Sequence, residues 1–253
     1  MQTELYSLMF EQERTYWWAQ GRRDLTLAIS STGLPSDHRC ARNILDVGCG
    51  TGALLEVLAE EGVPHGVDSS ELALAFCLRA GCTKLARASA EDLPFRSGTM
   101  DLLTSLDVFE HVPDDGKAAR ECFRILRPGG LLIVMVPAFQ WLWTDRDDRL
   151  GHVRRYRKHE IARLLSEAGF RVERCTYTNI SLVPVLMAAV LRGKLFESQR
   201  HVSTDIAAVP KTINTLLYTL VRLENAIALR LGLPFGTTVL AVAKKPADSQ
   251  AEG

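Results

Sequence analysis

The sequence has no excess of charge of either sign, because 30 lysine and arginine residues balance 30 aspartate and glutamate residues. A chain without net charge has no global attraction to nucleic acid or to an anionic membrane surface. Its 253 residues are 47% hydrophobic and 24% charged, a composition typical of a globular protein with a sizeable core. We therefore expect one large domain and no nucleic-acid partner.

Long hydrophobic runs are also lacking. The longest uncharged apolar segment, Ile180 to Leu191, is shorter than the roughly 20 residues that a membrane-spanning helix requires. The first residues, Met1 to Glu4, do not have the basic and then apolar pattern of a secretion signal. The sequence therefore predicts a cytoplasmic protein without a transmembrane segment, and it leaves peripheral membrane contact open.

The six cysteines form no CxxC pair and no cysteine–histidine group with zinc-ligand spacing. We expect buried free thiols rather than disulfides, which favours a reducing compartment. The acidic run from Asp145 to Asp148 has no recognised calcium-loop spacing, and a charged surface loop is the expected structure. No metal site is predicted from these patterns.

What the sequence does contain is a repeated alternation of short apolar runs and amphipathic segments. Strands are expected at 43–47, 63–67, 83–88, 100–106, 131–136, 170–177 and 237–244, and helices at 52–61, 70–80, 114–127, 158–168 and 211–231. Repeated β-α alternation predicts an α/β fold with a Rossmann-like, doubly wound sheet.

The domain is expected to have four parts. Residues 1–41 form an N-terminal helical cap whose helix is interrupted near Gly21, and residues 42–177 form the cofactor-binding core. Residues 178–236 form a helical insert, with a lid as the preferred hypothesis over a dimer contact, an interfacial membrane anchor or simple packing on the core. Residues 237–253 are the last strand and a disordered tail.

The segment from Asn43 to Gly52 is expected to hold a nucleotide-like cofactor. A buried strand is followed by three glycines at alternate positions, Gly48, Gly50 and Gly52, and then by a helix. Glycine permits positive φ and lets a ligand approach the main chain closely. Asp46, inside the strand, argues against a pyrophosphate, because its carboxylate would repel phosphates and attract an ammonium or sulfonium group.

A second acid, Asp68, ends the next strand about twenty residues after the glycines. At this place in a doubly wound sheet an acid binds the hydroxyl groups of a ribose, and we expect that role for Asp68. The alternative is a helix cap, which Ser69 and Ser70 could equally provide.

Five motifs in order resemble those of class I S-adenosylmethionine (SAM)-dependent methyltransferases, most of all the subgroup of ubiquinone and menaquinone biosynthesis methyltransferases. They are Leu45–Gly52, Gly66–Asp68, Ala90–Phe95, Phe109–Val112 and Leu126–Gly130. The resemblance covers residues 42–137 and implies a seven-stranded sheet in the order 3-2-1-4-5-7-6 with an antiparallel last strand. It also implies SAM as methyl donor and S-adenosylhomocysteine (SAH) as product.

Carried over by position, the resemblance implies the cofactor site. Asp46 and the loop from Gly48 to Gly52 would lie under the methionine part and the ribose, and Asp68, followed by Ser69, would hold the ribose hydroxyls. Two residues, Ala90 and Glu91, would flank the adenine, and Leu106 would lie beside the transferable methyl group. The family commonly has an acid before the alanine, where this chain has Ser89.

The N-terminal aromatic segment resembles that of a bacterial branch associated with natural-product or cell-surface glycan pathways. This resemblance implies that Tyr16, Trp18 and Arg22 close over the cofactor, with Arg22 or Arg23 pairing with its carboxylate. The alternative is an amphipathic helix whose aromatic side chains pack on the core.

Methyl transfer from a sulfonium requires mainly that the nucleophile is aligned with the S–CH3 bond. A base is needed only where the acceptor must lose a proton, and the candidate catalytic residues are His111, His152 and Tyr156. The alternatives are that Glu110 and His111 orient the loop and that His152 pairs with a nearby aspartate.

A group of arginines lies next to His152, namely Arg154, Arg155 and Arg157. These residues either bind an anionic small-molecule acceptor or form a solvated basic face.

Two other functions are considered. A nicotinamide-dependent oxidoreductase fits the GxGxxA pattern from Gly48 to Ala53 formally, but Asp46 counts against it. A non-catalytic cofactor-binding assembly factor would use the insert. The sequence does not decide whether oxygen, nitrogen or carbon receives the methyl group, or whether the protein is a monomer or a homodimer.

Overall fold

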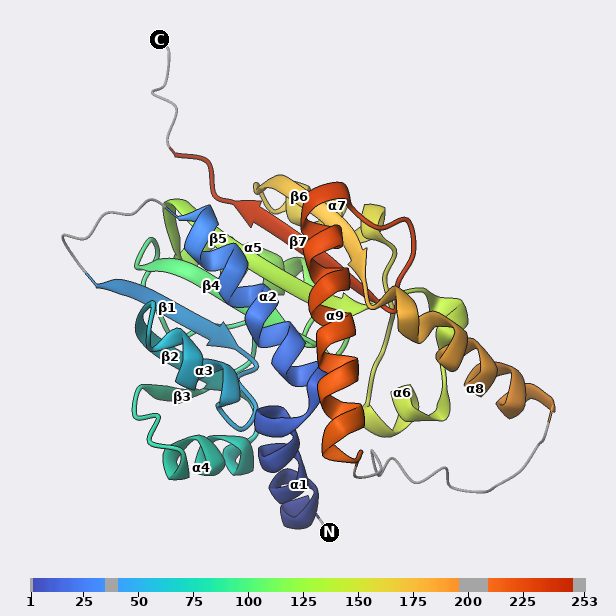
Figure 1. Ribbon diagram of the computed structural model, residues 1–253. Helices are drawn as coiled ribbons and strands as arrows, with labels where there is room; N and C mark the ends of the chain where they lie inside the picture. The colour runs from blue at the N-terminus through green and yellow to red at the C-terminus, as the bar shows by residue number, and fades with distance from the viewer. Residues whose placement is uncertain (1, 35–40, 196–208, 248–253) are drawn as a thin grey trace.

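The computed structural model describes residues 2–34, 41–195 and 209–247, which form one twisted sheet with helices on both faces (Figure 1). The strands are β1 (Arg42–Val47), β2 (Gly62–Asp68), β3 (Leu85–Arg87), β4 (Met100–Leu106), β5 (Leu126–Pro137), β6 (Arg171–Thr178) and β7 (Thr238–Lys244). They lie in the order β3-β2-β1-β4-β5-β7-β6, and β7 is antiparallel to both of its neighbours. The predicted strand order and antiparallel last strand are confirmed.

The helices follow the expected alternation. They are α1 (Gln2–Thr15), α2 (Trp17–Gly33), α3 (Ala53–Leu58), α4 (Glu71–Arg79), α5 (Asp115–Ile125), α6 (Asp145–Leu150), α7 (Lys158–Glu167), α8 (Val183–Leu195) and α9 (Lys211–Leu231), with single 3-10 turns η1 (Gln140–Leu142) and η2 (Ile180–Leu182). The layer of α2 and α3 packs on one face of the sheet, and the layer of α5 and α7 packs on the other.

The central strand β5 shows why both layers are needed. Its residues from Leu131 to Val136 are completely buried, and alternate side chains point to opposite faces. Leu131, Ile133 and Met135 pack in the α2 layer, whereas the even-numbered residues pack in the α5 layer. A continuous apolar run of this kind is typical of a strand covered on both faces.

The cap differs from the sequence expectation. The helix is broken at Tyr16, which is extended with φ −82° and ψ 136°, and Gly21 lies inside α2. A Cβ added at Gly21 would lie 2.4 Å from Cγ1 of Val221 in α9, and the side-chain amide of Asn225 donates a hydrogen bond to the Gly21 carbonyl oxygen at 3.0 Å. Gly21 therefore allows two helices to approach closely, and the expectation that the helix is interrupted near Gly21 is wrong, because the break lies at Tyr16.

The exposed face of α9 is a second difference. Its buried residues are Val221, Glu224, Asn225 and Ala228, and Val221 and Asn225 lie against Gly21 of α2. The apolar stripe of Leu216, Leu220, Leu223 and Ile227 is exposed instead, so its spacing does not mark packing on the core. The pairing of α9 with α2 is a tertiary contact that helical periodicity alone does not predict.

The described cysteines are free thiols, as expected, and Cys49, Cys77 and Cys122 are buried. Cys40 lies outside the described residues, as do residues 196–208 of the insert and residues 248–253 of the expected tail. Within the described ranges, no helix combines the length and the apolar character needed to cross a membrane.

Candidate functional site

The candidate site lies where the carboxyl ends of β1 and β4 meet. β1 is parallel to β2 on one side and to β4 on the other, so strands are added outward in one direction up to β3 and in the opposite direction from β4 on. Ligands of doubly wound sheets bind in the crevice at this topological switch point. Asp46 in β1, Asp68 at the end of β2 and Asp107 after β4 all lie at this edge.

The glycine loop after β1 has the backbone that its sequence predicts. Gly48 and Gly50 have φ of 74° and 53°, in the left-handed region that favours glycine. The Gly48 amide donates to the carbonyl oxygen of Val67 at 2.7 Å. A Cβ at Gly48 would lie 2.3 Å from Cγ2 of Val108, so the glycine loop can approach the segment that follows β4 only because Gly48 has no side chain.

Asp68 joins the glycine loop to the start of α4. One carboxylate oxygen accepts from the Gly50 amide at 3.0 Å, and the other accepts from the Ser70 amide at 2.8 Å. The Ser70 hydroxyl caps the N-terminus of α4 by accepting a hydrogen bond from the Ala73 amide, so Asp68 is not the only residue that caps this helix. Burial raises the pKa of Asp68. An ionised carboxylate accepts about four hydrogen bonds, which leaves room for ribose hydroxyls.

Asp46 is buried beside this loop with 3% of its surface exposed. It accepts a hydrogen bond from the Thr104 hydroxyl at 2.7 Å. Burial, with a smaller contribution from the nearby carboxylates of Glu13 and Asp68, raises the pKa of Asp46 to about 7. A cation placed against Asp46 would restore its charge, because an opposite charge favours the ionised form.

Helix α1 crosses the glycine loop and contributes residues that the sequence analysis missed. The Thr51 hydroxyl donates to the carboxylate of Glu13, and Arg14 donates to the Thr51 carbonyl oxygen at 3.2 Å. The Tyr6 hydroxyl donates to Ser70 at 2.8 Å. Glu13 lies three residues before the aromatic segment on the same predicted helix, but no local pattern indicates which loop it meets.

The cap residues that were predicted to close over the cofactor lie at the same edge. Arg22 stacks its guanidinium over the Trp18 ring at 4.4 Å and forms an ion pair with Asp107. Tyr16 packs against the ring of Trp17, with centroids 5.6 Å apart. A direct contact of these side chains with the cofactor stays a prediction.

The predicted adenine site lies in the loop after β3. Ala90 is buried, and Glu91 accepts from the Asp114 amide at 2.8 Å, which ties this loop to the start of α5. The Ser89 hydroxyl accepts from the Glu91 amide at 3.2 Å. Leu106 is half-buried at the end of β4, as expected. The ligand contacts of these residues, and of Ser69, stay predictions.

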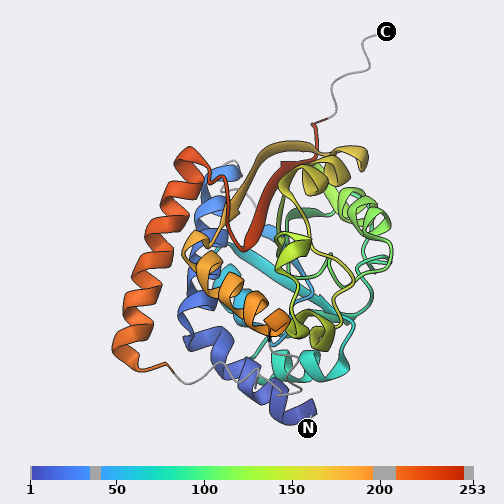
Figure 2. The same ribbon diagram turned by 90° about the vertical axis from the view of Figure 1, so that its right-hand side faces the viewer.

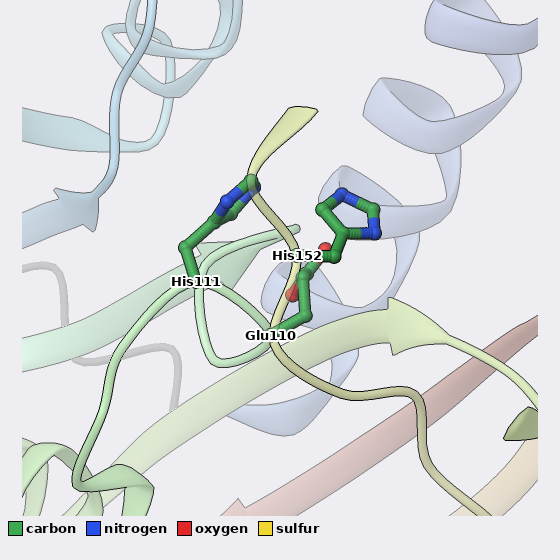
Figure 3. A group of neighbouring side chains, drawn as sticks. All are labelled: Glu110, His111 and His152. Atoms are coloured by element: carbon green, nitrogen blue, oxygen red, sulfur yellow. The ribbon is translucent and has the colours of Figure 1, made fainter. Parts of the chain in front are cut away.

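Glu110, His111 and His152 come together at the mouth of the crevice (Figure 3). The rings of His111 and His152 meet edge to face, with centroids 4.7 Å apart. Burial and the neighbouring His152 lower the pKa of His111, which favours the neutral form of its imidazole. Burial of the Glu110 carboxyl, together with the nearby charge of Asp107, raises its pKa well above the usual range.

His152 is held by the aspartate run, as one of the alternatives predicted. Its Nδ1 lies 2.8 Å from the carboxylate of Asp147, which also binds Arg155 at 2.7 Å. Burial acts to raise the pKa of Asp147, but these hydrogen bonds hold the pKa well below its usual range. The acidic run from Asp145 to Asp148 forms the start of helix α6, with a capping box at Thr144. The expectation of a surface loop is therefore wrong. Within this helix Asp147 is buried, with 1% of its surface exposed.

Tyr156 and Arg154 have internal partners. The buried Tyr156 hydroxyl donates to Asp115 at 2.8 Å and to the Phe109 carbonyl oxygen at 3.1 Å, and burial raises its pKa. Arg154 forms an ion pair with Asp115 at 2.6 Å. These contacts favour a structural role for Tyr156 over the predicted catalytic one. Of the three arginines, only Arg157 is exposed.

A hollow of about 310 Å³ lies away from these residues, between α3, β2 and residues 80–84. Its lining includes Val63 and Pro64 at the start of β2, so it lies at the opposite edge of the sheet. It is therefore not part of the crevice.

Comparison with known proteins agrees with this geometry. A family model described as a methyltransferase domain matches residues 45–134. A probable S-adenosylmethionine-dependent methyltransferase of Mycolicibacterium smegmatis is 33% identical over 141 residues, covering 54% of this chain and 55% of that protein. A ubiquinone biosynthesis O-methyltransferase of Pseudomonas fluorescens is 38% identical over 99 residues, covering 35% of this chain and 41% of that protein. The chain thus spans about half the length of the curated relatives it matches.

Among solved structures, phosphoethanolamine N-methyltransferase 2 of Haemonchus contortus, in complex with S-adenosyl-L-methionine, matches with a TM-score of 0.58. The two are 19% identical, and the match covers 88% of this chain and 52% of that one, which shows the fold alone. The family match adds the local sequence of the glycine loop and of β4, the two elements that form the crevice. The methyltransferase-domain match over residues 45–134 and the shared fold therefore support a class I SAM-dependent methyltransferase.

Proposed function

We propose that the protein transfers the methyl group of SAM to a small-molecule acceptor. Asp46 carries this proposal, because a buried carboxylate beside the glycine loop suits a sulfonium cation and opposes a pyrophosphate. The acceptor nucleophile attacks the methyl carbon, and the electron pair of the broken S–CH3 bond stays on sulfur. Positioning of the acceptor in line with this bond is the main contribution of the protein.

The acceptor is proposed to enter beside His111 and His152, beyond the cofactor. The similarity to a protein named as an O-methyltransferase supports a hydroxyl acceptor, for which a neutral imidazole can serve as the base. The proposed setting is bacterial secondary metabolism or the synthesis of a cell-surface glycan or lipid. An anionic acceptor would meet Arg157, the exposed member of the arginine group.

We extend the proposal to the insert, with α8 as part of a lid over a hydrophobic acceptor. Helix α8 lies at the end of the sheet that carries the crevice, near η1 (Figure 1, Figure 2). Val185, Met187 and Leu191 are exposed on it. The oligomeric state, monomer or homodimer, is a separate prediction that light scattering of the purified protein would check.

Calorimetry with SAM, SAH and NAD(H) tests the cofactor. We expect binding of SAM and SAH and none of NAD(H), and binding of NAD(H) alone would contradict the proposal. Release of SAH from SAM in the presence of phenolic or sugar hydroxyl compounds then tests the transfer. Cofactor binding without turnover on any acceptor would favour the non-catalytic assembly factor.

A further inference from the structure

Glu110 has an environment that the fold alone does not explain. Its side chain is completely buried, and neither carboxylate oxygen has a hydrogen-bond partner in any other described residue. A buried carboxylate without a partner strongly destabilises the folded state unless it is protonated or bound to a cation. A group of this kind therefore points to a ligand.

Two imidazoles face the same space. One ligand atom each from Glu110, His111 and His152 lies within 4.8 Å of the other two. Figure 3 shows the carboxyl group of Glu110 directed toward the space between the two rings. A transition-metal ion at roughly 2.0–2.2 Å from each ligand requires these atoms to approach somewhat further. His111 is the most exposed of the three, so its side chain has the most freedom to make this adjustment.

The outer contacts of the histidines match those of metal ligands. Because Asp147 is a carboxylate acceptor, Nδ1 of His152 carries the hydrogen of their 2.8 Å bond, and the lone pair of Nε2 is left for a ligand. The His111 ring has a hydrogen bond to the main chain of Gly151. Metal-binding histidines commonly donate their second nitrogen to a carboxylate or a carbonyl oxygen in this way.

The neighbouring cations do not replace the missing partner. Arg155 is bound by both of its ends to Asp147, and Arg22 is paired with Asp107. Each arginine is thus neutralised by its own aspartate. The negative charge of an ionised Glu110 is therefore available to neutralise a bound cation.

We propose that Glu110, His111 and His152 bind a divalent transition-metal ion of the zinc type. Two imidazoles and one carboxylate form a ligand set that suits zinc and leaves a coordination position open. No metal site was predicted from the sequence, because the three ligands come from two segments some forty positions apart. Such a separation leaves no local spacing pattern to recognise.

The consequence for catalysis rests on the proposed function. The ion binds the acceptor hydroxyl in its open position and lowers the pKa of that hydroxyl, as zinc does for bound water. The proton passes to solvent, the oxygen forms a bond to the methyl carbon, and the S–CH3 bond breaks with its electrons left on sulfur. The histidines then act as ligands rather than as bases.

Zinc titration of the untagged, chelator-treated full-length protein tests the proposal. We expect one zinc ion bound per chain, with affinity lowered about 10–100-fold or more by His111→Ala and by Glu110→Gln. The matched control is His159→Ala, a change at an exposed histidine of α7, which should leave zinc affinity unchanged. Cobalt(II) absorption bands that disappear in the two site variants would report on the same ligands without an activity assay.

The outcomes separate this inference from the proposed function. Thermal unfolding first shows that each variant is folded. No zinc binding by the wild type, or equal binding by the wild type and both site variants, would overturn the metal site. SAH binding without zinc binding would leave the proposed methyl transfer standing, whereas zinc binding without SAH binding would leave the metal site and contradict the cofactor assignment.

Discussion

Arg22 of α2 donates from Nη1 to the carboxylate of Asp107, the residue that follows β4. Asp107 has a left-handed backbone with φ 56°, a conformation that is uncommon outside glycine. The contact ties the helical cap to the end of β4, next to the position expected for the methyl group. It links residues from two separate segments across the mouth of the crevice.

Arg22→Ala should separate the cap from the core. We expect a loss of about 1–2 kcal/mol in the free energy of unfolding, because the pair is only partly shielded from solvent. Affinity for SAH should fall as well if the cap closes over the cofactor. Urea unfolding and calorimetry measure the two effects, with Arg163→Ala, in an exposed pair of α7, as the control. An unaltered stability would contradict a stabilising role for the Arg22–Asp107 contact.

Asp68→Ala should weaken the binding of SAM and SAH to the same extent. Both ligands carry the ribose, and a hydrogen bond to a charged group contributes about 1.5–3 kcal/mol, so we expect a loss of about 10–100-fold in affinity. Asp68→Asn, which keeps one acceptor oxygen for the Gly50 amide, separates loop disorder from loss of the ribose contact. Wild-type affinity in a folded Asp68→Ala protein would refute the ribose assignment.

The pKa of about 7 for Asp46 predicts opposite pH effects on stability and on SAM binding. Unfolded aspartate has a pKa near 3.9, so between about pH 4 and pH 7 the folded protein binds more protons than the unfolded chain. Stability without cofactor should therefore fall as the pH rises through this range. SAM carries a positive sulfur, so its affinity should rise as Asp46 ionises, whereas SAH lacks this charge.

Calorimetry with both ligands from about pH 5.5 to about pH 8 checks this prediction, because this range brackets the pKa of Asp46. The ratio of the SAH to the SAM dissociation constant should increase with pH in the wild type and should be nearly flat in Asp46→Asn. A ratio that rises equally in both proteins would assign the effect to another carboxyl group.

Tyr156→Phe distinguishes a structural from a catalytic tyrosine. The change removes the hydrogen bonds to Asp115 and to the Phe109 carbonyl oxygen, and we expect a loss of about 1–3 kcal/mol in stability. Affinity for SAH should stay at the wild-type level, since the hydroxyl faces away from the cofactor loop toward α5. A large loss of turnover with little change in stability would support the original catalytic assignment.

Local sequence patterns were sufficient to predict most of the fold. The apolar run of β5 and the glycines at 48, 50 and 52 act within a few positions, since strand burial and positive φ are properties of neighbouring residues. The start of α9 at Lys211 and its end at Leu231 were likewise expected from its periodicity. Which face of α9 is buried was not, because the answer depends on Gly21, some two hundred residues away.

The carboxylate Asp46 and the loop from Gly48 to Gly52 were determined by the sequence itself, as was their chemistry for a cationic cofactor. The partners of the remaining charged side chains were decided only by the tertiary structure. Asp147 proved to be buried under His152 and Arg155, and Glu110 proved to lie without a partner beside two histidines. Periodicity and spacing describe residues that are close along the chain, whereas desolvation and ion pairing depend on which distant segments the fold brings together.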